Sequence, residues 1–321
     1  MDQDNSKCYF CGSPEKPCDI EKYADNGIEY TLFECPRCGA QYWTPFKNPG
    51  AEWYENDERY AGRNLDPDIE ANWHQKKAID FLRPFVGKLL DVGCGAGTFM
   101  YWAEKMGWDV YGIDFDRDAI HTAKEVFKLK NVYDMDLAGF RKNFPDLKFN
   151  LVTFFDVFEH LDDHHDFLDQ VKGALNPGGY IAMSMPYRGG ARWLQLSDLP
   201  PRHLTRWNRS AISGYLEREG FEAVYVKRLP AGISFLVSKL QRKYGKYFSF
   251  NIIGKLKDRA RKEGGIKLGS AAERNIATAH KLARIKDVVI FGFPALIIWL
   301  AMLFSSKRYI GLFVIAGKKR Q

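Results

Sequence analysis

The sequence predicts an α/β fold in which a doubly wound parallel sheet is covered by helices on both faces. Three observations predict it. An apolar strand at 89–92 runs into a glycine-rich turn at 93–97 and then into an apolar run that suits a helix. A second short apolar segment, 109–114, ends on an acidic residue. Further apolar segments follow beyond residue 130, and strands that alternate with helices are typical of such sheets.

The glycine turn is the first element with chemical meaning. Gly93, Gly95 and Gly97 let the backbone approach a ligand closely, and the following helix offers unpaired N–H groups at its positive end. The spacing G-x-G-x-G differs from the G-x-G-x-x-G of dinucleotide sites, so a nicotinamide cofactor is not favoured. Cys94, inside the turn, is interpreted as a small packing residue and not as a nucleophile. We therefore expect a cofactor site of another kind.

Acidic residues follow the next strands. Asp114 ends the segment 109–114, at the place where a doubly wound sheet reaches a ribose, and is the expected ribose ligand. The segments 131–137 and 149–161 also turn acidic, and the segment 175–186 combines a turn with a buried strand. Asp116 and Asp134 fit equally well as ligands and as solvated helix caps.

In this order, over about 88–228, the motifs resemble those of class I S-adenosylmethionine-dependent methyltransferases. The resemblance implies a Rossmann-like seven-stranded sheet whose last strand is antiparallel, with S-adenosyl-L-methionine as cosubstrate. The segment Asp-Val-Phe-Glu-His-Leu at 156–161 is similar to the subgroup of ubiquinone-pathway O-methyltransferases and envelope-glycan methyltransferases.

The resemblance also assigns roles to single residues around the cosubstrate. Asp91 would face the methionine part, and Asp114 would bind the ribose hydroxyls. Asp136 would lie near the adenine amino group, and the corner of Phe155 and Asp156 would lie beside the sulfonium. Gly93, Gly95 and Gly97 would form the turn beneath it.

Composition agrees with one α/β domain plus additions. The chain has 321 residues, of which 45% are apolar, and it shows no internal repeat. Its first residues have neither a basic start nor an apolar run, so we expect no cleaved secretory signal and a cytoplasmic protein.

Four of the six cysteines form two knuckles, Cys8-x-x-Cys11-Gly and Cys35-x-x-Cys38-Gly. Four thiolates at this spacing predict a structural zinc ribbon over residues 1–48, with a closed tetrahedral site. Disulfides are the competing interpretation, which the missing secretory signal disfavours. Cys18 is either a substitute ligand or a surface thiol.

Aromatic residues gather between the ribbon and the glycine turn, in Gln41-Tyr-Trp-Thr-Pro and in the segment 53–60. The similar envelope-glycan enzymes imply that a segment such as 49–87 covers the cofactor or shapes the acceptor site. The aromatic side chains could equally serve only to pack the ribbon against the core, which we place at 88–230.

Two histidines are candidate catalytic residues. His203 lies in the loop 200–207, and an imidazole suits a general base, although a structural hydrogen bond is the simpler role. Arg202 and Arg206 could grip an anionic substrate group. His160 belongs to Asp-x-x-Glu-His at 156–160, which resembles the Glu-x-x-Glu-His linked to a divalent metal in ubiquinone-pathway O-methyltransferases. A metal held by Asp156, Glu159 and His160 is thus conceivable, but Asp shortens the reach, and we favour helix-start roles for Glu159 and His160.

The last third of the chain carries an insertion at 231–308 between a sixth strand and a last strand at 309–317. Residues 239–267 hold ten Lys or Arg against two acidic residues, which accounts for the net charge of +7. A segment with amphipathic character follows at 276–286, and then an uncharged apolar run at 288–304. As a helix this run spans only about 25 Å of a roughly 30 Å hydrocarbon core, and Pro294 would kink it. We expect an in-plane or re-entrant membrane helix, or else a helix buried in a dimer interface.

The sequence as a whole therefore predicts a methyltransferase peripherally bound to the cytoplasmic face of a membrane, which methylates a hydroxyl of a lipid-linked, quinone-like or glycan acceptor. An alternative is a ribosomal RNA methyltransferase that binds RNA through the ribbon and the basic tract, although the apolar run argues against a nucleic-acid partner. A non-catalytic module that binds S-adenosylmethionine is a third interpretation.

Overall fold

The computed structural model describes residues 7–50, 53, 73–83, 85–189, 198–248 and 288–319. The chain forms two compact units. The first contains residues 1–229 and 310–321, and the second contains residues 230–309.

A seven-stranded mixed sheet is the centre of the first unit, with the strand order β10-β11-β8-β7-β4-β5-β6. Its strands are β4 (Lys88–Val92), β5 (Asp109–Asp114), β6 (Val132–Asp134), β7 (Phe149–Phe155), β8 (Leu175–Pro186), β10 (Phe221–Pro230) and β11 (Tyr309–Lys318). The strands from β4 to β8 are parallel, whereas β11 runs antiparallel to β8 with Phe313 opposite Ser184. The Rossmann-like sheet, its antiparallel last strand and the long connection before that strand are confirmed.

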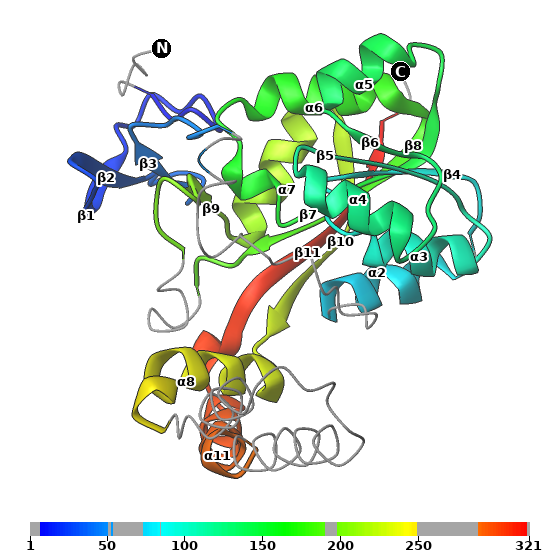
Figure 1. Ribbon diagram of the computed structural model, residues 1–321. Coiled ribbons are helices and arrows are strands. Elements are labelled where there is room, and N and C mark those ends of the chain that lie inside the picture. Colours follow the sequence, from blue (N-terminus) through cyan, green and yellow to red (C-terminus); the bar gives the residue numbers. More distant parts are fainter. Residues whose placement is uncertain are drawn as a thin grey trace, which may run out of the picture. The chain divides into compact units, whose positions relative to one another are not determined.

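Helices cover both faces of this sheet, as Figure 1 shows. One layer consists of α2 (Trp73–Leu82), α3 (Thr98–Lys105) and α4 (Arg117–Glu125), and the other of α5 (Leu137–Asn143), α6 (His164–Ala174) and α7 (Arg209–Arg218). Each layer buries its apolar stripe against the sheet in its own hydrophobic core. A short 3-10 turn, η1 (Phe158–His160), follows β7. The carboxyl ends of the parallel strands lie between the two helix layers. In such folds, ligands bind at this edge of the sheet.

The ribbon region shares a sheet with the core. Strands β1 (Cys18–Asp25), β2 (Ile28–Glu34) and β3 (Gln41–Thr44) are extended by β9 (Thr205–Arg206), in the order β1-β2-β3-β9. Because β9 belongs to the loop after β8, the cysteine-bearing region and the core are joined by backbone hydrogen bonds as well as by side chains.

Aromatic side chains fill the contact between ribbon and core. Phe10 lies 4.5 Å from Trp207 and 5.5 Å from Tyr215, measured between ring centroids. Tyr42 and Trp43 are fully buried. For the aromatic residues of the segment 41–45, the structure therefore shows the packing role that the sequence left open. Of the segment 49–87, residues 51–52, 54–72 and 84 lie outside the described part of the chain, so the structure describes only part of the predicted lid, including α2, and its covering role stays a prediction.

The second unit contains α8 (Ile233–Phe248), the π-helical turn η3 (Val288–Gly292), α11 (Phe293–Met302) and the 3-10 turn η4 (Ser306–Arg308). Pro294 stands in the first turn of α11, where it is tolerated, and the π-helical turn η3 ends directly before this helix, so a kink at Pro294 stays a prediction. Within the described residues, no helix has the length and apolar content needed to cross a bilayer. The basic tract beyond residue 248 and the segment 276–286 lie outside the described residues.

Candidate functional site

The glycine turn connects β4 to α3 at the carboxyl edge of the sheet. Gly93, Gly95 and Gly97 have φ angles of 72°, 52° and 85°, which L side chains rarely adopt. A Cβ atom on Gly93 would lie 2.6 Å from Val157 Cγ2, and one on Gly97 would lie 2.5 Å from Leu129 Cδ1. The turn thus needs glycine both for its backbone conformation and for its close packing, and it exposes backbone N–H groups at the start of α3.

Asp114 joins this turn to the end of β5. Its carboxylate accepts hydrogen bonds from the backbone N–H groups of Gly95, at 2.8 Å, and Asp116, at 2.9 Å. Burial raises the pKa of Asp114, while these two N–H groups oppose the shift. A carboxylate has acceptor sites beyond two hydrogen bonds, so Asp114 retains the capacity to bind ribose hydroxyls.

Asp91, near the end of β4, is only 3% exposed. The Thr153 hydroxyl donates a 2.6 Å hydrogen bond to Asp91 Oδ1. Burial, reinforced by the nearby charge of Asp114, raises the pKa of Asp91 to about 7. An ionised Asp91 is therefore costly in the unliganded protein, and a cationic ligand would favour its charged form.

Two of the three remaining acidic candidates, Asp116 and Asp136, cap helices. Asp116 accepts hydrogen bonds from two backbone N–H groups of α4, which confirms its interpretation as a cap. Asp134 pairs with Arg117, with 2.9 Å between Oδ2 and Nε. Asp136 is exposed and accepts a 2.7 Å hydrogen bond from Gly139 N as the cap of α5, a role that the resemblance did not include. Its contact with an adenine group stays a prediction.

The corner after β7, residues 155–157, packs against the glycine turn, because the Val157 side chain lies close to Gly93. Phe155 packs edge-on against Phe99, with ring centroids 4.9 Å apart. Asp156 has a φ of 54° and accepts a 2.8 Å hydrogen bond from the Ser184 hydroxyl. A non-glycine residue in this left-handed region is strained, a feature that clusters at binding sites.

Next to this corner the structure brings together both predicted histidines. The rings of His160 and His203 meet edge to face, with centroids 4.7 Å apart. His160 Nδ1 donates to the Arg202 carbonyl oxygen at 2.5 Å, and His203 Nδ1 lies 2.6 Å from Asp198 Oδ1. Burial lowers the pKa of His160 to about 3, so this ring is neutral at physiological pH.

Two carboxyl groups lie beside these rings, and both are buried. Glu159 is held at the backbone by a 2.8 Å hydrogen bond from Leu204 N to its carbonyl oxygen. Burial and the nearby charge of Asp156 raise the pKa of Glu159. For Asp198, burial acts in the same direction, but the hydrogen bond with His203 and the charge of Arg206 outweigh it and lower the pKa. The cluster can therefore accept a proton at His203 or hold a cation between the rings and Glu159.

The structure changes which residues could hold a divalent metal. The ligand atoms of Glu159, His160 and His203 lie within 4.8 Å of one another. Asp156 is not part of this group; its Oδ1 accepts from Ser184. The metal set derived from the sequence, with Asp156 as a member, therefore differs from the set that the geometry provides.

Asp198 is the member of this buried cluster that the sequence analysis missed. It lies in a proline-containing loop with no motif, and the only signal is a carboxylate five residues before His203. Arg206 has its Nε 2.9 Å from Asp198 Oδ2, and its Nη2 donates to the Asp198 carbonyl oxygen at 2.6 Å. Arg206 is therefore engaged in positioning this loop, in contrast to its expected role of gripping a substrate anion.

The four knuckle cysteines also meet. Their sulfur atoms lie within 4.8 Å of one another, with 3.9 Å between Cys8 and Cys38 and 3.6 Å between Cys11 and Cys35. All four are free thiols. In a tetrahedral zinc site with Zn–S bonds of about 2.3 Å, the sulfur atoms are about 3.8 Å apart, so the cluster fits zinc. Cys18 is exposed, and the buried Cys94 packs beneath Gly112, as expected.

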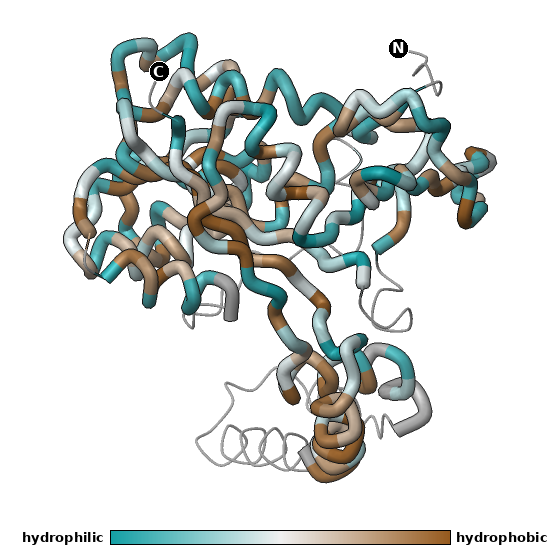
Figure 2. The backbone as a smooth tube through the Cα atoms, turned by 180° about the vertical axis from the view of Figure 1, so that it is seen from behind, coloured by the Kyte–Doolittle hydropathy of each residue, from teal (hydrophilic) through white to brown (hydrophobic). Residues whose placement is uncertain are grey.

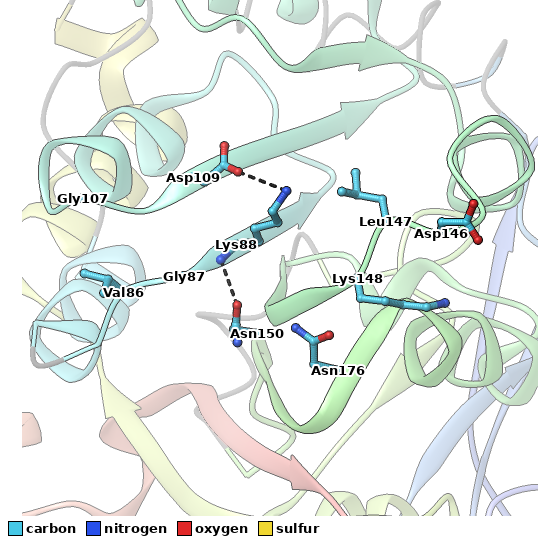
Figure 3. A pocket seen from close by; sticks show the side chains of 10 residues that line it. All are labelled: Val86, Gly87, Lys88, Gly107, Asp109, Asp146, Leu147, Lys148, Asn150 and Asn176. Carbon is cyan, nitrogen blue, oxygen red and sulfur yellow. Dashed lines mark hydrogen bonds and ion pairs between the residues drawn. The ribbon is translucent and has the colours of Figure 1, made fainter.

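A separate surface hollow of about 690 Å³ lies at the amino ends of β4, β5 and β7 (Figure 3). Within it, Lys88 N donates a 3.0 Å hydrogen bond to Asn150 Oδ1, and Lys88 Nζ pairs with Asp109 Oδ2 at 3.5 Å. Its lining contains none of the site residues that the sequence predicted. The hollow therefore lies at the opposite edge of the sheet from the glycine turn.

Comparisons with known proteins support a methyltransferase fold. A protein from Mycolicibacterium smegmatis, described as a "Probable S-adenosylmethionine-dependent methyltransferase", is 28% identical over 134 residues, or 42% of this chain and 51% of that protein. The ubiquinone biosynthesis O-methyltransferase of Proteus mirabilis is 24% identical over 156 residues, covering 47% of this chain and 62% of the relative. The chain thus spans less than two thirds of these relatives.

Among solved structures, phosphoethanolamine N-methyltransferase 2 of Haemonchus contortus, in complex with S-adenosyl-L-methionine, superposes with a TM-score of 0.52 at 15% identity. The match covers 94% of this chain and 71% of that protein, and it shows a shared fold. The family described as "Methyltransferase domain" matches residues 59–226, just over half of the chain. With its glycine turn, its strand order and this match, the chain belongs to the methyltransferase-domain family.

Proposed function

We propose that the protein is an S-adenosylmethionine-dependent methyltransferase that methylates a hydroxyl group of a lipid-linked, quinone-like or glycan acceptor at the cytoplasmic face of a membrane. The assignment as an S-adenosylmethionine-dependent methyltransferase rests on the junction of the glycine turn with Asp114. A buried carboxylate held by Gly95 N, at the carboxyl edge of the sheet, is the arrangement that a ribose requires.

Each residue of this edge has a distinct task in the proposed reaction. Asp114 binds the ribose, the turn N–H groups and Asp91 hold the methionine part with its positive charge, and Phe155 limits the space around the sulfonium. S-adenosylmethionine supplies the methyl group, whose carbon bonds to the acceptor oxygen as its bond to sulfur breaks. The hydroxyl proton must leave, and S-adenosylhomocysteine is the second product. The protein contributes orientation and the exclusion of water.

A hydroxyl acceptor is supported by the polar cluster next to the sulfonium corner. His203 places an imidazole there that could take the hydroxyl proton, and the His160 ring beside it stays neutral because burial lowers its pKa to about 3. The ubiquinone biosynthesis O-methyltransferase of Proteus mirabilis, which by its name methylates oxygen, favours the same acceptor class.

Membrane attachment is supported by the second unit. Several apolar side chains of α11, and those of Leu303 and Phe304 after it, are exposed, with Phe293 66% and Phe304 95% accessible to solvent. Figure 2 shows this helix as one of the most hydrophobic segments of the chain. A ten-residue helix is only about 15 Å long, so the proposed attachment is in the plane of the interface. The backbone hydrogen bond from Ala231 N to Arg308 O, 2.9 Å long, brings both ends of this unit together, as an attachment from one side requires.

The cysteine cluster is proposed to hold a structural zinc ion. Four free thiols at zinc-like separations support it. This ion would stabilise the ribbon and would have no open position for chemistry.

Calorimetric titration with S-adenosylmethionine tests the cosubstrate. Wild type should bind, and Asp114→Asn should weaken binding at least tenfold through the lost carboxylate. Asp109→Asn, at the amino end of the same strand, is the matched control and should bind like wild type. Equal affinity of all three proteins would contradict the assignment of the carboxyl edge.

Flotation with anionic liposomes tests whether the protein binds to a membrane. The full chain should float, whereas replacing Phe293 and Ile297 by Ser should leave it in the dense fraction. Val224→Ser, which removes an exposed apolar side chain from β10, should still float. If wild type does not float, soluble acceptors become the better candidates.

A further inference from the structure

A cluster of four cationic side chains lies at the edge of the core sheet where its parallel strands begin. Its members are Arg141 of α5, Lys148 in the loop before β7, Lys172 of α6 and Lys318 at the end of β11. We propose that this cluster is a binding site for a ligand that carries two or more phosphate groups. It shares no residue with the cosubstrate edge or with the histidine pair, so the proposal does not rest on the proposed function.

The four side chains gather around the last turn of α6, to which Lys172 itself belongs. Lys148 Nζ donates to the carbonyl oxygen of Gly173 at 2.7 Å, and Lys318 Nζ donates to that of Lys172 at 2.8 Å. Arg141 Nη1 donates to a carbonyl oxygen less than one turn earlier, at 2.7 Å. Because an α-helix rises about 1.5 Å per residue, the three acceptor atoms span only about 5 Å along its axis. The cationic groups therefore converge on one small region.

This region carries more positive charge than its surroundings neutralise. Lys172 pairs with Asp169, with 2.6 Å between Nζ and Oδ1. Among the described residues, in contrast, Arg141, Lys148 and Lys318 form no ion pair with a carboxylate. The carbonyl end of α6 supplies only about half an elementary negative charge. Three positive charges less this half leave a surplus of roughly 2.5 charges, which attracts multivalent anions.

The repulsion within the cluster is visible at Lys318. Burial, together with the positive charges of Lys148, Lys172 and Arg141, lowers the pKa of its ammonium group. A bound anion would relieve this repulsion. Donors for it are also present, because a lysine ammonium has three N–H groups. Within the described residues, Lys148 and Lys318 each use no more than two of these on backbone carbonyls.

The hollow at the amino edge provides space beside the cluster. Its volume is about 690 Å³, and Lys148 is part of its lining (Figure 3). The side-chain amides of Asn150 and Asn176 line the same hollow and can donate hydrogen bonds to phosphate oxygens. Two carboxylates also line it. Asp109 pairs with a lysine, and the charge of Asp146 offsets only part of the positive surplus.

The competing interpretation is that these cations only cap α6, because positive side chains stabilise the C-terminus of a helix. A cap accounts for the three hydrogen bonds to carbonyl oxygens. It accounts neither for the uncompensated charge nor for the amide-lined hollow beside it. A cap alone predicts that losing one cation lowers stability, whereas a binding site predicts that it also lowers the affinity for a polyphosphate.

Calorimetric titration of the full chain with inorganic pyrophosphate at low ionic strength tests the site. Wild type should bind pyrophosphate at one site, and more tightly than orthophosphate, because the second phosphate reaches further cations. Lys148→Gln and Lys318→Gln should each weaken binding about tenfold through the loss of one charge-assisted hydrogen bond. Lys318→Arg, which keeps the charge, should retain binding. Lys142→Gln removes an exposed cation from α5 outside the cluster and is the matched control, which should bind like wild type.

A second measurement covers a glutamine variant that does not fold. Acetylation of wild-type lysines, read by mass spectrometry, should slow at Lys148 and Lys318 when pyrophosphate is added and should not change at Lys142. If Lys142→Gln weakens binding as much as Lys318→Gln does, or if all three lysines are protected equally, the effect is diffuse and the site is refuted.

Vesicles that contain phosphatidic acid distinguish a free phosphate compound from a lipid headgroup. The protein with Phe293 and Ile297 replaced by Ser lacks the apolar attachment proposed for the second unit. For a free ligand, this protein should stay in the dense fraction and still bind pyrophosphate. Flotation that is lost when Lys318→Gln is added would assign the same site to a headgroup. A wild type that binds neither pyrophosphate nor, through Lys318, such vesicles would overturn the proposal.

Discussion

Replacing Asp91 by Asn should stabilise the unliganded protein at neutral pH while weakening the binding of S-adenosylmethionine. Burial raises the pKa of Asp91 from the ordinary 3.8 to about 7 in the folded state. Between about pH 4 and pH 7, the folded protein therefore keeps a proton on Asp91 that the unfolded chain releases. Asn keeps the size of the side chain and still accepts the hydrogen bond from Thr153, but it has no charge to bury.

The size of the effect follows from linkage. A pKa difference of about three units, at 1.36 kcal/mol for each, corresponds to about 4 kcal/mol. Because the folded-state pKa is raised, this contribution is fully present below pH 4 and is lost as the pH rises to about 7. The free energy of unfolding of wild type, relative to Asp91→Asn, should therefore fall by about 4 kcal/mol between pH 4 and pH 8.

Urea denaturation of both proteins across this pH range measures the difference, and taking the difference cancels the titrating groups that do not interact with Asp91. Thr153→Val is the second variant. It removes a hydrogen bond that favours the ionised form, so the pH-dependent fall should extend to higher pH. A difference between wild type and Asp91→Asn that stays flat from pH 4 to pH 8 would refute our account of Asp91.

Three further predictions concern packing and the metal. Gly97→Ala should lower the free energy of unfolding by about 1–3 kcal/mol in urea denaturation, because its Cβ meets Leu129 in a left-handed backbone; unchanged stability would contradict this. Phe10→Ala should cost about 3–5 kcal/mol by losing its contacts with Trp207, whereas a loss below 1 kcal/mol would mean that the ribbon packs loosely. Cys35→Ser should lower the bound zinc measured by elemental analysis, and an unchanged zinc content would remove the ribbon site.

The fold could be predicted from the sequence wherever a signal is local. The strand that ends at Val92, the glycine turn and the helix from Thr98 are contiguous, and the structure confirms each of them. The last strand was predicted from its own apolar pattern, although a long insertion precedes it. In contrast, β9 has only two residues and no periodicity, so its pairing with β3 could not be predicted from sequence.

The same distinction applies to the acidic residues at the strand ends. Asp114 follows a strand directly, so its position at the carboxyl edge could be predicted from sequence. Asp136 follows a strand as well, but a helix begins immediately after it, and its carboxylate caps that helix. A carboxylate between a strand and a helix can serve as ligand or as cap, and only the local backbone decides which hydrogen bonds it makes.

The two halves of the candidate site differ in how they are encoded, and this explains why the family could be predicted better than the acceptor. The cosubstrate half is built from consecutive strand-turn-helix units, so its residues occur in a fixed order with short spacings. The proposed acceptor half joins the turn at Phe158–His160 to a loop more than forty residues later, through the hydrogen bond from Leu204 N to Glu159 O and the contact of two imidazole rings. Such a junction depends on how a loop packs on the sheet edge. Asp198 therefore gains its role only in the folded chain, and acceptor chemistry can vary while the cosubstrate half stays recognisable.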